Sequence, residues 1–273
     1  MGIFDRFRKK ASDSWTETTE SRSGPKTDEY TPGGSPVYRY QNHQQEEGPR
    51  PPEKVGLYAE AVEAHFNRLF PNRGHFVLHE ILSDLIHVDI HILRPAGDAN
   101  YYVLYTTGMS DLPMCLPEGL EDREDLKYAE LYMFLPGSWN VGEDLESSQN
   151  LPPESYWPFQ MLKFLARFPH EYNTWLGFGH TMPNGPDYAP LCDGVGFGGM
   201  VLDWQGEDIG RIETEDGHDV LLYFVIPAYK EEIEYKLKYG MEGLQERYAK
   251  GDLPLILDPH RPNLCADFHE ILD

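Results

Sequence analysis

Residues 75–114 carry the clearest alternation of apolar and polar positions in this 273-residue chain. Within IHVDIHIL (86–93), the apolar positions Ile86, Val88, Ile90 and Ile92 alternate with the polar positions His87, Asp89 and His91. A period of two predicts a β-strand with one buried face. The turn-forming residues RPAGDAN (94–100) follow, and YYVLYTT (101–107) is almost entirely aromatic or β-branched. These segments predict a β-hairpin near the middle of a sheet.

Three later segments predict further strands. LYMFLPGSW (131–139) is apolar and aromatic until Pro136 and Gly137 interrupt it. Residues 220–226 are seven consecutive apolar residues, which is typical of a strand covered on both faces. We therefore expect a central strand there. Residues 177–204 predict short strands separated by proline and glycine.

Three segments show apolar residues at helical spacing. These residues are Leu57, Ala61, Ala64 or His65, and Leu69 in the first segment, Phe159, Leu162, Leu165, Ala166 and Phe168 in the second, and Ile233, Leu237, Met241, Leu244 and Tyr248 in the third. Pro71 and Pro169 are expected to end the first two helices. The third helix begins with acidic and ends with basic residues, as the helix dipole favours. We expect its apolar stripe to dock on the sheet.

The first 52 residues differ in composition from the rest of the chain. Ser, Thr, Gln, Gly and Pro dominate residues 11–52, and aliphatic residues are few. Such a segment buries too little apolar surface to offset the entropy lost on ordering. We expect residues 1–52 to be a flexible polar tail and residues 53–273 to be the folded domain.

The formal net charge of −23 lies in the predicted domain. Residues 1–54 contain 9 Lys/Arg and 9 Asp/Glu, so 14 of the 23 basic and 37 of the 46 acidic residues follow. An acidic surface repels nucleic acid and accelerates encounter with a basic protein, although it also serves solubility alone. Four clustered acidic residues are therefore a candidate partner-binding surface: Glu121, Asp122, Glu124 and Asp125.

The sequence also indicates the compartment. No apolar stretch reaches the roughly 18–20 residues that a membrane span needs, and the N-terminus lacks the apolar core of a secretory signal. Cys115, Cys192 and Cys265 stand far apart without a CxxC pair, which argues against a disulfide framework or a thiolate zinc site. We expect a cytoplasmic protein.

The strongest candidate for chemistry is the strand face formed by His87, Asp89 and His91. Two imidazoles and a carboxylate at alternate strand positions can hold Zn²⁺ or Fe²⁺. No further ligand with diagnostic spacing completes such a site, so we favour the interpretation of a polar strand face.

The glycines of residues 193–199 precede a strand-like run rather than the helix that a phosphate loop needs. The residues by themselves therefore assign no catalytic residue, cofactor or metal.

Several segments together resemble the Suppressor of fused domain family, and in particular its bacterial members. They are HVDIHIL, YYVLYTTGMSDLPM, YAELYMFLP, WPFQMLKFLARFPHEYNTWLGFGHT, PLCDGVGFGGMVL and VLLYFVIPAYKEEIEYKLKYGMEGL. The resemblance covers roughly residues 53–267. It implies a single mixed α/β (α+β) domain with a largely antiparallel central sheet flanked by helices, equivalent to the N-terminal domain of the animal proteins.

The resemblance also implies protein binding rather than catalysis. Animal members bind and restrain Gli-type transcription factors, and bacterial members are associated with polymorphic toxin loci, where they are inferred to be immunity proteins. The animal contact region corresponds here to residues 168–180. Phe168 and Gly179 stand where the animal proteins have a Tyr and an Asp that grip the partner, so Gli-like binding does not carry over. Phe168, Trp175 and His180 are the candidate anchors of this region.

Our leading hypothesis is a non-enzymatic immunity protein that neutralises a cognate, basic toxin domain. One alternative is a metal-dependent hydrolase that uses His87, Asp89 and His91. The other is a regulatory domain with a different protein partner. The sequence leaves the oligomeric state and the identity of the partner open.

Overall fold

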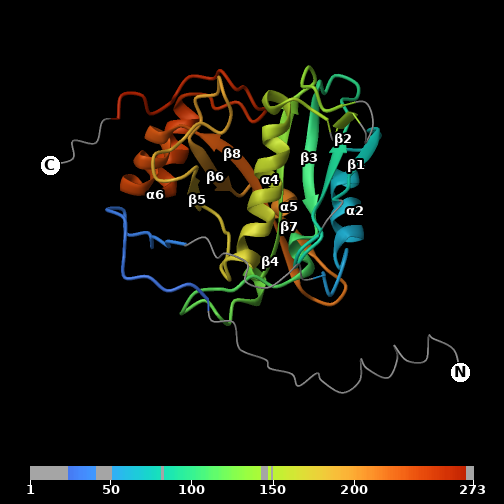
Figure 1. The fold of residues 1–273 in the computed structure, drawn as a ribbon, viewed down its shortest axis with the longest axis horizontal. Coiled ribbons are helices and arrows are strands. Elements are labelled where there is room, and N and C mark those ends of the chain that lie inside the picture. Colours follow the sequence, from blue (N-terminus) through green and yellow to red (C-terminus); the bar gives the residue numbers. More distant parts are fainter. Residues whose placement is uncertain (1–23, 41–50, 81–82, 143–146, 149, 269–273) are drawn as a thin grey trace, which may run out of the picture.

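The structure is a computed structural model that describes residues 24–40, 51–80, 83–142, 147–148 and 150–268. Its described part is a mixed α+β fold in which helices flank one eight-stranded sheet (Figure 1). The strand order is β1-β2-β3-β4-β8-β6-β5, and β7 also pairs with β8. Among the described strands only β4 and β8 run parallel. The predicted fold class, with its largely antiparallel sheet, is confirmed.

The strands are β1 (His75–Leu78), β2 (Asp89–Leu93), β3 (Tyr101–Thr107), β4 (Tyr128–Pro136), β5 (Thr181–Pro183), β6 (Gly199–Asp203), β7 (Arg211–Glu213) and β8 (Asp219–Ala228). The helices are α2 (Ala59–Leu69), α4 (Pro153–Glu171), α5 (Glu207–Gly210) and α6 (Lys230–Lys250), with short 3₁₀ turns η1 (Met109–Asp111) and η2 (Glu124–Leu126). Figure 1 shows α4 across the sheet, α6 near the β5 end and α2 near the β1 end. No described helix is both long and apolar enough to cross a membrane.

The predicted hairpin is formed by β2 and β3. Asp89 lies opposite Thr107 and Leu93 lies opposite Val103. β2 begins at Asp89 rather than at Ile86, since the chain still turns at Leu85, whose φ is 65°. The expectation of one buried face is wrong, because His91 is buried as well as its apolar neighbours. Both faces of β2 are therefore covered.

The apolar run at residues 220–226 lies in β8, which has β4 on one side and both β6 and β7 on the other. This confirms the predicted central strand. Phe224 is buried, and its ring centroid lies 5.2 Å from that of Tyr132 and 5.4 Å from that of Phe134. The middle of the sheet is thus held by aromatic packing across the parallel β4–β8 pair.

The helices depart from the predicted patterns in three details. α2 buries Val62, His65 and Phe66, while Leu57 before it is 40% exposed. Pro169 does not end α4, which continues to Glu171. A proline removes only its own N–H, and Tyr172 N–H still bonds to the Phe168 carbonyl. α6 is interrupted at Gly240, whose φ of 77° no helix allows.

Residues 24–40, which fall in the segment predicted as a tail, contact the domain. The Tyr40 hydroxyl is 2.6 Å from the Thr174 hydroxyl, and its ring meets Phe168 edge to face at 4.9 Å. Gly33 N–H donates to the Leu237 carbonyl of α6 at 3.0 Å. Amino-acid composition could not predict these contacts, because only a few tyrosine rings and backbone groups make them. Residues 1–23 and 41–50 lie outside the described residues.

The carboxyl group of Glu130, in β4, is fully buried beside the point where β3 leads into η1. Glu130 accepts hydrogen bonds from the Thr106 hydroxyl at 2.6 Å and from the Ser110 N–H and hydroxyl at 2.9 and 2.6 Å. Burial nevertheless raises the pKa of Glu130 to about 7. Burial therefore opposes ionisation of Glu130 more strongly than these three hydrogen bonds favour it.

This buried carboxyl predicts a pH dependence of stability. The pKa rises from 4.5 to about 7 on folding, so the unfolded chain ionises first and stability falls as pH increases between these values. Relative to Glu130→Gln, which cannot ionise, the wild-type free energy of unfolding should fall by roughly 3 kcal/mol between pH 4.5 and 8. Urea denaturation across this range measures the difference.

Glu118→Gln makes the same change at an exposed carboxyl and is the control for the substitution itself. A pH-independent difference between wild type and Glu130→Gln would mean that the three hydrogen bonds keep Glu130 ionised throughout.

Candidate functional site

A large groove lies between residues 25–40 and the part of the domain around the end of α4. Its volume is about 1880 Å³, and its walls also come from residues 172–188, from β6 and from the middle of α6. Its lining includes three exposed aromatic side chains, which are Tyr30 at 63%, Phe178 at 48% and Phe164 at 42% exposed. Exposed aromatic side chains around a concavity are typical of a protein-binding surface.

The three predicted anchors all line this groove. Phe168 is buried, stacked on Tyr172 at 4.7 Å and covered by Tyr40. Trp175 is half-buried and meets the His180 ring edge to face at 4.4 Å. Burial, with a smaller effect of Lys236, lowers the pKa of His180 to about 4, so the imidazole is neutral at pH 7. The anchors thus form an uncharged aromatic wall, with Phe168 beneath it.

Gly179 has a structural reason to be glycine. Its φ of 75° lies in the left-handed region, and its N–H bonds to the Leu202 carbonyl of β6. An aspartate at this position would be strained.

The acidic residues lie in the loop just beyond the groove. Pro117, Glu118 and Leu120 line the groove, and the predicted carboxylates follow them along the chain. Arg123 holds Asp125 through two hydrogen bonds of 2.8 and 2.6 Å, and Lys127 lies 2.5 Å from Glu124. Glu121 and Asp122 are exposed and have no basic partner among the described residues. Half of the predicted acidic cluster is therefore compensated locally.

The lining of the groove itself carries no excess of charge. Its acidic residues are Asp28, Glu29, Glu118 and Glu234, and its basic residues are Lys26, Arg39, Lys236 and Lys238. The groove therefore offers mainly aromatic contacts, whereas the acidic loop offers uncompensated negative charge.

The structure separates the three residues of the predicted metal-binding strand face. His87 and Asp89 group with His79, whereas His91 groups with His75 and Glu63. β2 supplies one residue to each group, while β1 supplies His75 and the residue directly after β1 is His79. The three-residue site that a hydrolase would need is not formed, and a local sequence pattern could not reveal the β1 and α2 contributions.

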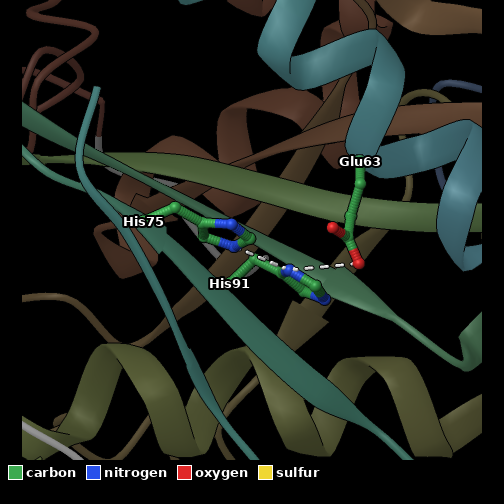
Figure 2. A group of neighbouring side chains, drawn as sticks. All are labelled: Glu63, His75 and His91. Carbon is green, nitrogen blue, oxygen red and sulfur yellow. Dashed lines mark hydrogen bonds and ion pairs between the residues drawn. The ribbon is translucent and has the colours of Figure 1, made fainter. Parts of the chain in front are cut away.

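The first group joins the edge strand β1 to β2 and α2 (Figure 2). His75 Nε2 is 2.9 Å from His91 Nδ1, and the Glu63 carboxylate is 3.9 Å from the same Nδ1. His91 Nε2 is 3.0 Å from the Thr107 hydroxyl. Burial lowers the pKa of His75 and brings the pKa of His91 to about 4, where the neighbouring His75 contributes as well. Both imidazoles are neutral at pH 7.

The second group is internally hydrogen-bonded. Asp89 Oδ2 is 2.9 Å from His79 Nδ1, and Asp89 Oδ1 is 3.0 Å from His87 Nε2. The Glu80 N–H also donates to Asp89 Oδ1, and Ser83 Oγ is 2.7 Å from His87 Nδ1. The Asp89 carboxylate therefore fastens the turn between β1 and β2.

Comparison with known proteins decides the family. The family model described as "Suppressor of fused protein (SUFU)" matches residues 84–262, which is well over half of the chain. The chain belongs to the Suppressor of fused family. The resemblance stated from sequence segments is confirmed. No curated protein matches the chain.

Solved structures of this family share the fold at low identity. A Suppressor of fused homologue from Neisseria gonorrhoeae is 13% identical with a TM-score of 0.54, covering 76% of this chain and 96% of that one. A chain of the Sufu–Fu complex is 15% identical with a TM-score of 0.53, covering 75% and 91%. Drosophila Suppressor of fused is 14% identical with a TM-score of 0.50, covering 76% of this chain and 51% of that one.

The region matched by the family model contains most of the groove but only part of the first histidine group. It includes the aromatic wall, the acidic loop and His91, but not residues 24–40, Glu63 or His75.

The sequence did not predict Phe164, Phe178, Leu237 and Met241 as groove residues. Leu237 and Met241 had been assigned to a buried helix stripe, which Gly240 interrupts.

Proposed function

We propose that this Suppressor of fused domain is a non-enzymatic protein-binding module, and that its partner is a toxin domain that it neutralises as an immunity protein. The aromatic groove between residues 25–40 and α6 carries the proposal, because it presents exposed Phe164 and Phe178 beside a half-buried Trp175. A related fold is found in a complex of Sufu with Fu, which supports partner binding by this kind of domain.

The charge of the chain supports a basic partner. The net charge is −23, yet the groove lining is balanced in charge. We infer that the acidic loop with Glu121 and Asp122 attracts the partner and that the groove then holds it. Covering a basic toxin such as a nuclease would block its contacts with nucleic acid.

Co-expression tests the immunity role. A toxin domain encoded beside this chain should arrest bacterial growth when it is expressed alone, and the chain should restore growth and form a stable complex with it. Failure to restore growth, with a complex still formed, would favour the alternative of a regulatory domain. Absence of a complex with any neighbouring gene product would contradict the proposal.

The groove is tested by one substitution with a matched control. Phe178→Asp should weaken binding of the partner by at least about 30-fold, because it places a charge in an apolar contact worth about 2 kcal/mol or more. Val55→Asp changes a 64% exposed residue that does not line the groove, and should leave affinity within about twofold. Equal effects of the two variants would place the interface elsewhere. Surface plasmon resonance measures both.

The acidic loop should control the rate of association rather than dissociation. Replacing Glu121, Asp122, Glu124 and Asp125 by Ser or Asn should lower the association rate by about tenfold at low salt. Because Arg123 and Lys127 already pair with Asp125 and Glu124, Glu121→Ser with Asp122→Asn should produce most of this effect.

Salt provides the control for this charge effect. At 1 M salt the Debye length is about 3 Å, so the variants and the wild type should associate at similar rates. An unchanged association rate at low salt would leave the acidity as a solubility feature.

A further inference from the structure

The group of Glu63, His75 and His91 has the composition of a metal site that was assembled from three elements. α2 supplies the carboxylate, and the neighbouring strands β1 and β2 supply one imidazole each (Figure 2). All three ligand atoms lie within 4.8 Å of one another. From this convergence we propose that Glu63, His75 and His91 bind a divalent transition-metal ion of the Zn²⁺ type.

The spacing of the ligand atoms fits such an ion. Zn²⁺ binds histidine nitrogen at about 2.0–2.1 Å in tetrahedral geometry, which puts neighbouring ligand atoms roughly 3.3 Å apart. The observed distances from His91 Nδ1 are 2.9 Å to His75 Nε2 and 3.9 Å to Glu63. The two values lie on either side of the required spacing. Small side-chain movements of half-buried Glu63 and exposed His75 would therefore complete the geometry.

The surroundings of His91 prepare it as a ligand. Its Nε2 lies 3.0 Å from the Thr107 hydroxyl, so an N–H at Nε2 leaves the lone pair on Nδ1 directed at the other two groups. A hydrogen bond from the second ring nitrogen is the usual means of fixing a metal-binding histidine. The ring is also held by stacking on Tyr105 at 4.7 Å. His75 is exposed, so its N–H can move to Nδ1, and a metal would then replace the proton that Nε2 now shares with His91 Nδ1.

The third ligand, Glu63, and the nearby Tyr105 hydroxyl are both available to a hydrated ion. The Glu63 carboxylate accepts no hydrogen bond from another described residue, and its contact with His91 Nδ1 is long at 3.9 Å, so a metal between the two groups would replace a weak interaction. The Tyr105 hydroxyl is buried without a partner among the described residues, and burial, with a smaller contribution from the Glu63 charge, raises its pKa. A water on the metal would offer this hydroxyl a partner.

The second histidine group is the less suitable site. Both oxygens of Asp89 are already engaged by His79 and His87, and Oδ1 also accepts the Glu80 N–H. A metal there would have to break bonds that hold the β1–β2 turn. His79 therefore provides a matched control, since it is an exposed histidine on the same segment as His75.

The structure also indicates what the metal would do. β1 is an edge strand that pairs only with β2 among the described strands, and Glu63 belongs to the helix at this end of the sheet. A bound ion would tie α2 to the sheet edge. Since a ligand that binds only the folded state stabilises it, Zn²⁺ should raise the midpoint of thermal unfolding.

The experiment titrates the chelator-treated full chain with Zn²⁺ by isothermal titration calorimetry. We expect one ion per chain, affinity lowered at least tenfold in His75→Ala and in Glu63→Gln, and affinity within about twofold of wild type in His79→Ala. Zn²⁺ should raise the unfolding midpoint of the wild type and of His79→Ala, but not of the other two variants. Co²⁺ should give the visible absorption of a tetrahedral ion in the wild type and lose it in His75→Ala.

Both test variants change residues that are not fully buried, and equal midpoints without metal confirm that they fold. Absence of saturable Zn²⁺ binding to the wild type would overturn the proposal. Binding that is unchanged in both His75→Ala and Glu63→Gln would overturn it too. Loss of binding in His79→Ala alone would place the ion at the second group and would equally overturn it.

Discussion

Arg261→Met is expected to lower the free energy of unfolding by about 3–5 kcal/mol, because it leaves a buried carboxylate without its counter-charge. Arg261 donates from both terminal nitrogens to the two oxygens of Glu232, each at 2.6 Å. Neither side chain is appreciably exposed. The guanidinium also donates to the Pro227 carbonyl at 2.9 Å and lies over the Phe197 ring. The pair therefore fastens the C-terminal segment to the start of α6 and the end of β8.

Glu232 shows why the loss would be large. It also accepts the N–H groups of Tyr229 and Leu264, each at 3.0 Å. Those bonds stay when Arg261 is replaced, and they hold the carboxylate in a buried position where it cannot gain water. The charge then has neither solvent nor a counter-charge, which is the costly case for a buried ion.

A more exposed ion pair, which also joins α6 to the C-terminal segment, gives the control. Arg247 lies 3.2 Å from Asp267, whose side chain is 67% exposed, so Arg247→Met should cost less than about 1 kcal/mol. Urea denaturation measures both variants. Similar small losses for Arg247→Met and Arg261→Met would show that Glu232 reaches water or a proton when its partner is removed.

The sequence was sufficient for elements whose pattern is local. The alternation in residues 86–93 and the apolar run in 220–226 predicted β2 and β8, because side-chain period and burial on both faces leave a direct trace in the residue order. Prediction was weaker where tertiary contacts decide. Pro169 reads as a helix end, yet α4 continues beyond it, and Gly240 interrupts a stripe that looked continuous.

The candidate sites show the same division. Phe168, Trp175 and His180 were proposed as anchors because the family resemblance marks residues 168–180 as a contact region, and the groove does contain them. The opposite wall comes from residues 25–40, whose polar composition gave no sign of it. His91 was grouped with His87 and Asp89 because they alternate on one strand. The pairing of β1 with β2, and the position of α2 above them, joined His91 to His75 and Glu63 instead.

Phe224→Ala is expected to lower the free energy of unfolding by about 3–5 kcal/mol, through loss of buried apolar surface and creation of a cavity. Phe224 is 3% exposed in β8, which lies between β4 and β6. Its ring contacts Tyr132 and Phe134 of β4, so the cavity would open where the two halves of the sheet meet. Neighbouring strands are fixed by hydrogen bonds and cannot collapse into the space, which keeps the cost high.

Phe164→Ala is the matched control, because it removes the same side chain from a 42% exposed position on α4. It should cost less than about half as much, since much of its surface already meets solvent. Thermal or urea unfolding of both variants at one pH measures the difference. A Phe224→Ala variant as stable as Phe164→Ala would mean that β8 does not join the two halves of the sheet, and the parallel β4–β8 pair would then have to be wrong. A large loss of stability for Phe224→Ala but not for Phe164→Ala would show that packing across the β4–β8 pair contributes strongly to the stability of this Suppressor of fused domain.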